Sequence, residues 1–411
     1  MNTKNSPKRK IINDPVYGFV TIRHPFILQL IDHPWYQRLR RVAQMGLSHL
    51  VYPGALHNRF QHAVGAMHLM QNAIDEIRLR NHEITEEEEI GLLAAILLHD
   101  IGHGPFSHAL EFILAKGVHH EYISSIMMEE LNKDFDGKLS LAIDIFNNRY
   151  HKKFLHELVS SQLDMDRLDY LARDSFFSGV VEGQVGSERI LKMLDVVNDQ
   201  LVVEEKGIYS IEKFIVARRF MYWQVYLHKT VLSAEHMLIS AMKRARELAL
   251  QGVELFCSPS LRYFLYNEIS KEEFQNGGEA LHHYAQLDDF DITLSLKVWQ
   301  THSDTVLSTL ASKILKRDLL KIELRKEPFD AGYVNAIRQK VAAHYGITMD
   351  EASYFVLNDS VDNKAYNRKH DTIKILMKNG EVKDAVQVSD QTNLAALSET
   401  VQKYFVAYPE I

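Results

Sequence analysis

Apolar residues recur at helical spacing along much of the first 250 residues. Between Arg59 and Arg80 they fall three or four positions apart, which places them on one face of a helix. These positions are Phe60, Ala63, Val64, Met67, Ile74 and Ile77. Two further long helices are predicted at residues 155–174 and 211–249, and a shorter one from Pro34, a favourable first-turn residue, to Gly46. We therefore expect a succession of helices from residue 24 to about 250.

The segment from Thr85 to Leu98 predicts a buried central helix. Thr85 and Glu88 have the spacing of a capping box, and the acidic residues 86–89 lie at the positive end of the helix dipole. The residues that follow are apolar on nearly every face, which is typical of a helix packed on all sides. The helix is expected to break at Gly102.

After residue 250 the pattern changes. Gly277-Gly278 and the run DDFDIT at 288–293 are predicted as loops, and helices alternate with strand-like runs. Residues 371–388 place Asn379-Gly380 between alternating segments, which indicates a β-hairpin. We expect a mainly α protein with a helical core over residues 1–250 and a smaller helical and α+β region over residues 251–411.

Composition limits the possible classes of protein. Hydrophobic residues make up 46% of the chain and charged residues 25%, values typical of a globular protein. The net charge of −7 argues against extended nucleic-acid binding, so any phosphate site must be a local basic pocket. Cys257 is the only cysteine, which excludes an intrachain disulfide. The longest apolar run, near Leu92–Leu98, is too short for a membrane span, and we expect a cytoplasmic protein.

Three short segments carry the clearest chemistry. His62 lies in HNRFQHAVG, His99 and Asp100 lie in LLHDIGHGPFSH, and Asp166 lies in LDMDRLDYLARD. Imidazole and carboxylate together suit a divalent first-row metal better than calcium. Two His and two Asp ligands leave positions for a water and a phosphate oxygen, and the metal lowers the pKa of that water. The alternative is a His-Asp pair that only caps a core helix.

Residues near these segments could bind a phosphorylated sugar. Arg59 and His62 share a helix face, so a guanidinium could grip a phosphate beside the metal; alternatively Arg59 pairs with the acidic run 86–89. Asp166, Tyr170 and Asp174 are spaced by four and form one stripe. The stripe suits a pocket wall in which Tyr170 stacks under a sugar and Asp174 accepts a sugar hydroxyl. The alternative is an ordinary amphipathic helix.

Three histidines close to His99 are candidates for proton transfer. They are His103, His108 and His120. Histidine titrates near neutrality, and Glu111 could orient one ring and raise its pKa. Each could instead be structural. The chain has no Walker A loop, no GxSxG elbow and no HExxH motif.

Five segments, in order, resemble the HD-domain deoxynucleoside triphosphate (dNTP) triphosphohydrolases, a family that includes the SAM-and-HD-domain enzymes. The segments are NDPVYG, QRLRRVAQMG, YPGALHNRFQHAVG, LLHDIGHGPFSH and LDMDRLDYLARD, and the resemblance covers residues 10–235. It implies an HD-domain helical core and hydrolysis of a dNTP at the α-phosphorus, giving deoxynucleoside and inorganic triphosphate.

The resemblance also implies a role for individual residues. His62, His99, Asp100 and Asp166 would bind a divalent metal, which could be Mn, Fe, Ni, Zn or Mg, and His103 and His120 would be catalytic with Glu111 as acidic partner. Arg59, His108, Arg167 and Arg218 correspond to phosphate contacts, although Arg167 stands where the family has a lysine. Gln44, Tyr170 and Asp174 correspond to deoxyribose contacts and Tyr226 to a base-stacking residue, whereas Leu227 replaces a polar base contact.

A second nucleotide site is implied near the N-terminus. Asp32, Gln37 and Arg40 resemble residues that recognise guanine at an allosteric site, with Lys10 and Asn13 nearby. A carboxylate and an arginine match the donors and acceptors of guanine. The alternative is a structural role, with Asp32 near the N-cap of the helix at 34. The site would imply a guanine-nucleotide activator and a homo-oligomer, a dimer or tetramer.

The sequence leaves two other functions open. The chain could hydrolyse another phosphate ester, such as a nucleoside monophosphate, a cyclic nucleotide or a guanosine polyphosphate, because HD sites share ligands across substrates. It could also be a nucleotide-binding regulator.

Overall fold

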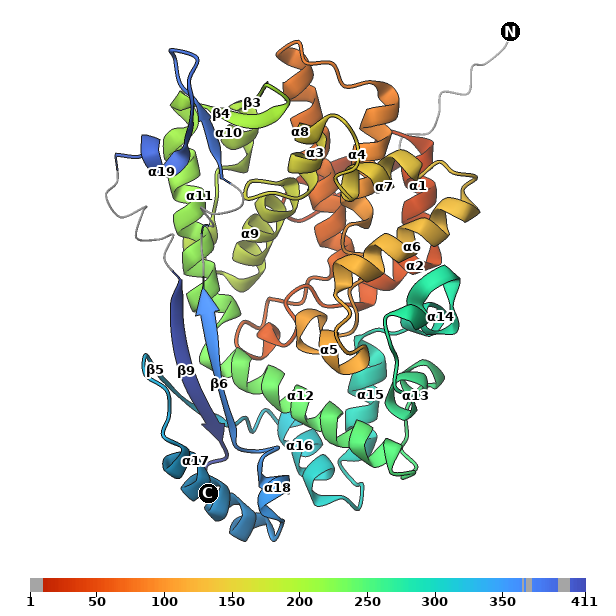
Figure 1. Ribbon diagram of the computed structural model, residues 1–411, viewed down its shortest axis with the longest axis vertical. Coiled ribbons are helices and arrows are strands. Elements are labelled where there is room, and N and C mark those ends of the chain that lie inside the picture. The colour runs from red at the N-terminus through yellow and green to blue at the C-terminus, as the bar shows by residue number, and fades with distance from the viewer. Residues whose placement is uncertain (1–9, 364–365, 367–371, 391–399) are drawn as a thin grey trace.

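Helices dominate the structure, which is a computed structural model that describes residues 10–363, 366, 372–390 and 400–411 (Figure 1). The mainly α fold predicted from the sequence is confirmed. The helices up to residue 250 are α1 (Pro25–Asp32), α2 (Pro34–Gln37), α3 (Arg59–Leu79), α4 (Glu86–Leu98), α5 (Glu111–Leu114), α6 (His120–Asp134), α7 (Ser140–Phe146), α8 (Lys153–Val159), α9 (Met165–Ser178), α10 (Ser187–Lys192), α11 (Ile208–Met221) and α12 (Lys229–Leu250). Those that follow are α13 (Pro259–Tyr266), α14 (Glu279–Tyr284), α15 (Asp289–Trp299), α16 (Thr305–Leu315), α17 (Ala331–Tyr345), α18 (Met349–Ala352) and α19 (Ala385–Val388).

The centre of the molecule is the pair α3 and α4, with α9 packed on α3. The helix predicted at Arg59–Arg80 is confirmed within a residue; α4 starts where predicted but ends at Leu98, before the break expected at Gly102. The side chains of Thr85 and Glu88 form the predicted capping box at the start of α4, and Asn58 with Gln61 forms another at the start of α3. Every residue of α4 from Gly91 to Leu98 is buried. Because α4 is enclosed, the residues at its C-terminal end are held inside the protein rather than at its surface.

The strands form three small sheets. One is the hairpin of β1 (Lys10–Asp14) and β2 (Gly18–Ile22), and a second has the order β5 (Lys321–Arg325), β9 (Val401–Tyr408), β6 (Leu357–Asn363). The third has the order β3 (Leu194–Val197), β4 (Gln200–Glu204), β7 (Lys374–Leu376), β8 (Val382–Asp384). In that sheet β4 pairs with β7 in parallel, Val203 opposite Ile375.

The hairpin predicted around Asn379-Gly380 is confirmed. β7 and β8 are antiparallel with Leu376 opposite Val382, and the Met377 amide donates to the Glu381 carbonyl across the turn at 2.8 Å. Gly380 has φ +85°, which glycine adopts without strain. Asp371, the first residue of the predicted segment, lies outside the described residues.

Three predicted helices were too long. The segment after Pro34 is helical only to Arg41, and Val42 is extended because Ala43 bridges to Asn58. Residues 155–174 are two helices, since Ser160 is extended and Asp164 caps α9 by accepting from the Arg167 amide. Residues 211–249 are also two helices, separated by a π-helical turn at Tyr222–Tyr226 and by the N-cap His228.

Two further predictions about local structure were wrong. The run DDFDIT is not a loop but the start of α15, where Asp288 and Asp291 form a capping box. The succession of helices before residue 250 is interrupted by the β3–β4 hairpin, whose turn residues Asn198 and Asp199 both have positive φ. That turn is the type that short hairpins prefer.

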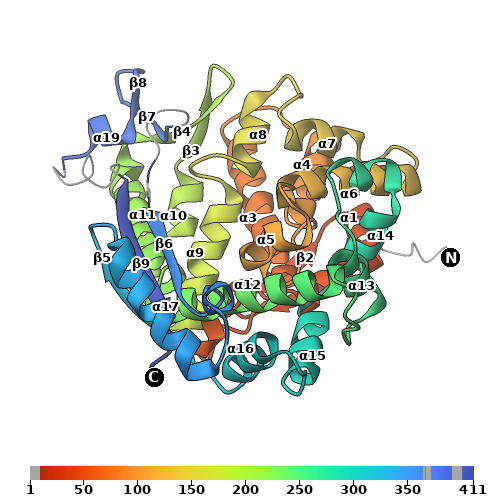
Figure 2. The same cartoon turned by 60° about the horizontal axis from the view of Figure 1, so that its bottom comes forward.

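Elements after residue 250 brace the helices before it. Figure 2 shows α12 running across the molecule above α15 and α16, and α12 packs directly on α16. The buried Arg38 donates to the carbonyl of Leu287 at 2.9 Å and to that of Ile101 at 2.6 Å. The Tyr284 hydroxyl donates to the Gly102 carbonyl at 3.0 Å. Among the described residues, no helix has the length and apolar character needed to cross a bilayer.

Candidate active site

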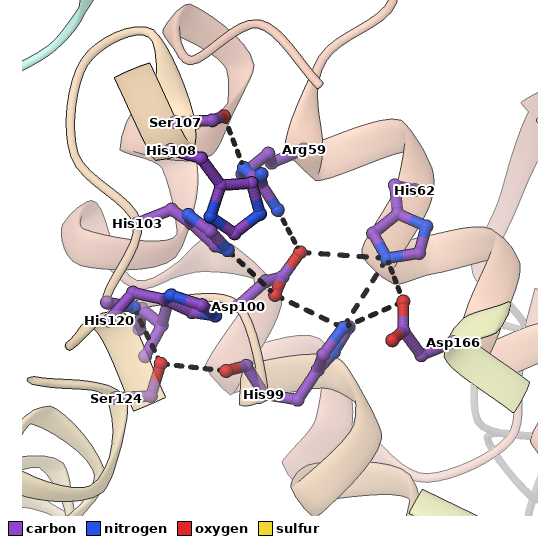
Figure 3. Close-up of polar contacts among 12 residues, drawn as sticks. Arg59, His62, His99, Asp100, His103, Ser107, His108, His120, Ser124 and Asp166 are labelled. Carbon is purple, nitrogen blue, oxygen red and sulfur yellow. Dashed lines mark hydrogen bonds and ion pairs between the residues drawn. The ribbon is translucent and has the colours of Figure 1, made fainter. Parts of the chain in front are cut away.

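Four side chains from three separate segments of the chain converge at the C-terminal end of α4. His62 lies in α3, His99 ends α4, Asp100 follows it, and Asp166 lies in the first turn of α9; we call this set the His–Asp quartet. Figure 3 shows the four side chains pointing toward one another. His62 Nε2 lies 3.1 Å from Asp166 Oδ1 and 3.4 Å from His99 Nε2, and His99 Nε2 lies 3.3 Å from Asp100 Oδ1. The structure thus brings together all four residues predicted as ligands.

The other nitrogen of each imidazole is held by the protein. His62 Nδ1 lies 2.7 Å from Asp169 Oδ2, and His99 Nδ1 lies 2.6 Å from the Ile96 carbonyl oxygen. These contacts fix the Nδ1–H tautomers and leave both Nε2 atoms facing the centre of the quartet, an arrangement usual around protein metal ions.

Asp169 is itself fixed by a buried ion-pair chain. Arg173 donates to both oxygens of Asp169 at 2.9 Å and to Asp14 at 2.8 Å, and all three side chains are buried. Sequence reasoning missed these roles. Asp169 is three residues after Asp166, and Arg173 is four after Asp169, so helical spacing carried a signal for the pair but not for Asp14.

A divalent first-row cation fits this set of donors. Two imidazole nitrogens and two carboxylates are brought together from α3, the end of α4 and α9, and ligand atoms of His62, His99 and Asp100 all lie within 4.8 Å of one another. Burial opposes protonation of His62, but hydrogen bonds to Asp166 and Asp169 outweigh it and raise its pKa to about 10. Burial acts against the Asp166 carboxylate too, but the two histidines lower its pKa. The quartet therefore favours positive charge among its carboxylates, which a cation would supply.

Arg59 joins the quartet to the loop that follows α4. Its guanidinium forms an ion pair with Asp100, and its Nε donates to Ser107 Oγ at 2.9 Å. The alternative pairing with the acidic run 86–89 is not seen, since Glu88 contacts Lys152 and Glu89 contacts Arg78. Arg59 therefore stands beside the quartet, where a phosphate could reach it.

The loop after Gly104 has an unusual backbone. Phe106 and Ser107 have φ values of +52° and +53°, a region that side chains other than glycine rarely adopt. Asp289 holds the loop, because its Oδ1 accepts from the Phe106 amide at 2.7 Å and its Oδ2 accepts from the Ala43 amide at 2.8 Å. The carboxylate at the start of α15 thus fixes two loops at the site.

The three nearby histidines form one cluster around Glu111. The rings of His103 and His120 stack with centroids 3.8 Å apart, and His108 meets both edge-on. His120 Nδ1 lies 2.8 Å from Glu111 Oε1, which also accepts from the His120 amide at 2.7 Å. Burial opposes the charge on Glu111, but hydrogen bonds from the histidines lower its pKa. Burial lowers the pKa of His103, whose Nε2 lies 3.3 Å from Asp100.

A cavity of about 480 Å³ opens beside the quartet, a volume within the roughly 300–1,000 Å³ typical of small-molecule sites. Most of the residues predicted to bind the substrate or to act in catalysis line it. They are Gln44, Arg59, His103, His108, His120, Arg167, Tyr170, Asp174 and Tyr226. Glu111 lies behind His120. Arg218 does not line the cavity; its guanidinium donates to Gln162 at 3.2 Å.

Two polar groups of the cavity have distinct surroundings. Both Asp174 oxygens are engaged, one 2.7 Å from His57 Nε2 and the other accepting from the Tyr226 hydroxyl at 2.7 Å. His57 is buried and was not predicted as a site residue. Gln44 Oε1 is buried and has no hydrogen-bond partner among the described residues, so it is available to a ligand.

The residues predicted for a second nucleotide site are spread over four elements. Lys10 and Asn13 lie on β1, Asp32 ends α1, and Gln37 and Arg40 lie close together after it. The Gln37 amide donates to the Ile31 carbonyl at 2.7 Å, and its oxygen accepts from Arg40 at 2.8 Å. The N-cap of α2 is His33 and not Asp32. Within the described residues, no hydrogen bond or ion pair links Lys10 or Asn13 to the other three side chains.

Two known protein families match parts of this chain. The HD domain family matches residues 59–174, and the HD associated region matches residues 185–255. The chain is 31% identical to the Bacillus subtilis protein YwfO, over 92% of this chain and 87% of that protein. It is 33% identical to the deoxynucleoside triphosphate triphosphohydrolase SAMHD1 homolog of Dictyostelium discoideum, over 57% of this chain and 49% of that protein.

A solved structure is similar over nearly the whole chain. The crystal structure of a phosphohydrolase from Bacteroides thetaiotaomicron is 52% identical, with a TM-score of 0.95 over 98% of this chain and 100% of that one. The quartet and most of the cavity-lining residues lie within the matched HD region.

Proposed function

The chain belongs to the HD-domain phosphohydrolase family, and from that premise we propose that it hydrolyses deoxynucleoside triphosphates to deoxynucleoside and inorganic triphosphate. The observation that carries the proposal is the cavity itself. The quartet lies at one side of it, two arginines and three histidines line it nearby, and Tyr170 and Asp174 continue along α9 from Asp166. A polyanion attached to a sugar matches this order of groups.

His62, His99, Asp100 and Asp166 would hold the divalent cation. When bound, it supplies a water of lowered pKa and neutralises charge on the phosphate. The protein positions these ligands through Asp169 and the Ile96 carbonyl oxygen, as described above. In the proposed reaction a water oxygen bonds to the α-phosphorus, the bond from phosphorus to the 5′-oxygen breaks, and that oxygen takes a proton.

The histidine cluster is suited to supply this proton. Glu111 holds Nδ1 of His120, which leaves Nε2 as the nitrogen available to the cavity. His103 stacks on His120 and is favoured in its neutral form by burial. We assign the transfer to the 5′-oxygen to this pair, as general acid catalysis by a positioned imidazole.

The remaining lining residues would bind the substrate. Arg59 and Arg167 present planar guanidinium groups that can grip phosphate oxygens in pairs. Tyr170 would stack under the deoxyribose, and Asp174, fixed by His57 and Tyr226, would accept its 3′-hydroxyl. Gln44 has a buried oxygen free for a further sugar contact.

Product analysis tests the proposal. The purified protein is incubated with each dNTP and each rNTP in Mn²⁺ or Mg²⁺, and the products are separated by chromatography. Release of tripolyphosphate from dNTPs alone is the expected result. Release of phosphate or pyrophosphate would instead indicate a different phosphate ester as substrate, and no turnover with either metal would indicate a nucleotide-binding regulator.

We further propose that a guanine nucleotide bound at Lys10, Asn13, Asp32, Gln37 and Arg40 promotes assembly into a dimer or tetramer. The proposal is supported by the resemblance of these residues and by the exposure of Lys10, Asn13, Asp32 and Arg40. Sedimentation with and without GTP tests it, since mass action predicts a larger species only in the presence of nucleotide.

A further inference from the structure

Glu235 of α12 lines the cavity beside the quartet and has no part in the metal binding, proton transfer or substrate contacts proposed for that cavity. A Cβ atom at Gly46 would lie 3.4 Å from Glu235 Oε1, so the carboxyl group reaches the turn at Gly46. Asp166, Tyr170 and Asp174 all come from α9. Glu235 therefore belongs to a second wall of the cavity, made by α12 and the Gly46 turn.

The carboxyl group of Glu235 differs from the other acids at the cavity in lacking a partner. Five carboxylates line the cavity. Asp100 and Asp166 contact histidines of the quartet, Asp174 contacts His57, and Glu121 lies 3.6 Å from His120. Within the described part of the chain, no hydrogen bond or ion pair involves Glu235. Burial raises the pKa of its carboxyl group to about 7, as expected for an acid without a donor beside it.

An unpartnered acid in a phosphate-binding cavity must face the uncharged part of the ligand. A triphosphate carries several negative charges and would be repelled by a carboxylate. The cations that can hold it are Arg59 and Arg167, and among the described residues neither forms an ion pair or hydrogen bond with Glu235. The sugar is served by Asp174 on the α9 wall. The part of the substrate that remains for the α12 wall is the nucleobase, next to Tyr226 and Leu227.

We propose that Glu235 reads the nucleobase and selects guanine, an inference that rests on the proposed hydrolysis of dNTPs. Guanine presents two adjacent N–H donors on one edge, and these match the two oxygens of one carboxylate. Adenine and cytosine present one donor beside an acceptor, and thymine presents one donor between two carbonyl oxygens. The ionised carboxylate therefore pairs fully with guanine alone among the four bases, and the two N–H donors of guanine favour that ionised form.

Substitution by the isosteric amide tests the assignment. Glu235→Gln replaces one acceptor by a donor, which spoils the match to guanine and suits adenine instead. We expect wild type to hydrolyse dGTP with the highest kcat/KM, and the ratio of kcat/KM for dGTP over dATP to fall at least about tenfold in the variant. Glu129→Gln, which changes an exposed acid on α6, is the matched control and should leave the ratio unaltered.

The outcomes separate this inference from the proposed function. An unchanged ratio in Glu235→Gln, or a wild type that does not prefer dGTP, overturns the role of Glu235 while dNTP hydrolysis stands. If wild type hydrolyses no dNTP, the proposed function fails, and calorimetric binding of dGTP and dATP in EDTA decides the inference. Tighter binding of dGTP that is lost in Glu235→Gln supports it, and equal or absent binding overturns it. The melting temperature of the variant should not fall, because the carboxyl group has no partner to lose.

Discussion

At the scale of single residues, the proposed chemistry depends on the acidic side chains that hydrogen-bond the site histidines as much as on the quartet itself. Asp169 fixes His62, and Glu111 fixes His120. Each acid is held in turn, Asp169 by Arg173 and Glu111 by the His120 amide. Such supporting contacts set the tautomer and direction of each imidazole before a ligand arrives.

Replacing a quartet carboxylate should abolish turnover without unfolding the protein. Asp166→Ala removes one of the four converging ligands, and we expect loss of bound metal and a fall in kcat/KM of roughly a thousandfold or more, since a catalytic metal contributes several kcal/mol. Metal content by mass spectrometry and circular dichroism check the two parts. Asp144→Ala on α7 is a surface control. Full activity with stoichiometric metal in Asp166→Ala would contradict the ligand assignment.

Glu111 should make the free energy of unfolding fall as the pH becomes acidic. Its folded pKa lies below the usual value of 4.5, so the folded state binds its proton less readily than the unfolded chain. The stabilisation, about 2 kcal/mol for hydrogen bonds to a charged group, is complete above pH 4.5 and is lost as the pH falls below it. Urea unfolding of wild type and Glu111→Gln at several pH values between 3 and 7 measures the difference. A difference independent of pH would exclude this role.

The residues proposed to bind metal and substrate are easier to identify from the sequence than the buried residues that hold them in place. The quartet and most cavity residues stand out because histidines, acids and arginines recur in short motifs. Asp14, His57 and Asp169 are single polar residues whose partners lie on other elements, so only the fold identifies them. Arg218, which the resemblance implies to be a phosphate contact, donates to Gln162 in the structure, and its role at a phosphate stays a prediction.

At the scale of elements, the sequence predicted where helices lie better than where they stop. α3 was predicted from its apolar face, and the start of α4 was predicted from its capping box and the apolar run that follows. The breaks near Ser160 and His228 were missed because each depends on a side-chain cap or on a π-helical turn within a continuous apolar pattern. Asp288 and Asp291 lie in a run predicted as a loop, and their three-residue spacing is that of a capping box.

The cap of α15 gives a measurable contribution to stability. Asp288 accepts from the Phe290 amide at 3.0 Å and pairs with Arg41. Asp288→Ala should lower the free energy of unfolding by about 1–2 kcal/mol, chiefly through the lost cap, because the partly exposed Arg41 is screened by solvent. Chemical denaturation checks the value. Asp318→Ala, which removes an exposed acid, should change stability by far less; equal effects would show that the cap is unimportant.

At the scale of the whole molecule, the two halves of the sequence share one structure around the site. Arg38 donates a hydrogen bond to the Leu287 carbonyl, and the Tyr284 hydroxyl donates to the Gly102 carbonyl. Asp289 accepts from the backbone amides of Ala43 and Phe106. The division at residue 250, inferred from the change in the pattern of predicted elements, stays a prediction.

A fragment of residues 1–250 tests that division. Without residues 251–411 the buried guanidinium of Arg38 loses the Leu287 carbonyl, one of its two partners. The face of α12 that packs on α16 is also uncovered. An unsatisfied buried group costs about 1–3 kcal/mol or more, and the lost apolar contacts add to this. We expect no cooperative thermal transition in the fragment by circular dichroism. A sharp transition together with metal binding would show that the helical core folds alone.

The parallel pairing of β4 with β7 has a consequence for synthesis in the cell. Val203 leaves the ribosome well before Ile375, its partner. At about 5–20 residues per second, the nascent chain carries an unpaired edge on β4 for roughly 10–30 seconds. Such late, non-local closure also raises contact order and slows folding. Interrupted translation products ending between these positions should therefore be the species most dependent on chaperones.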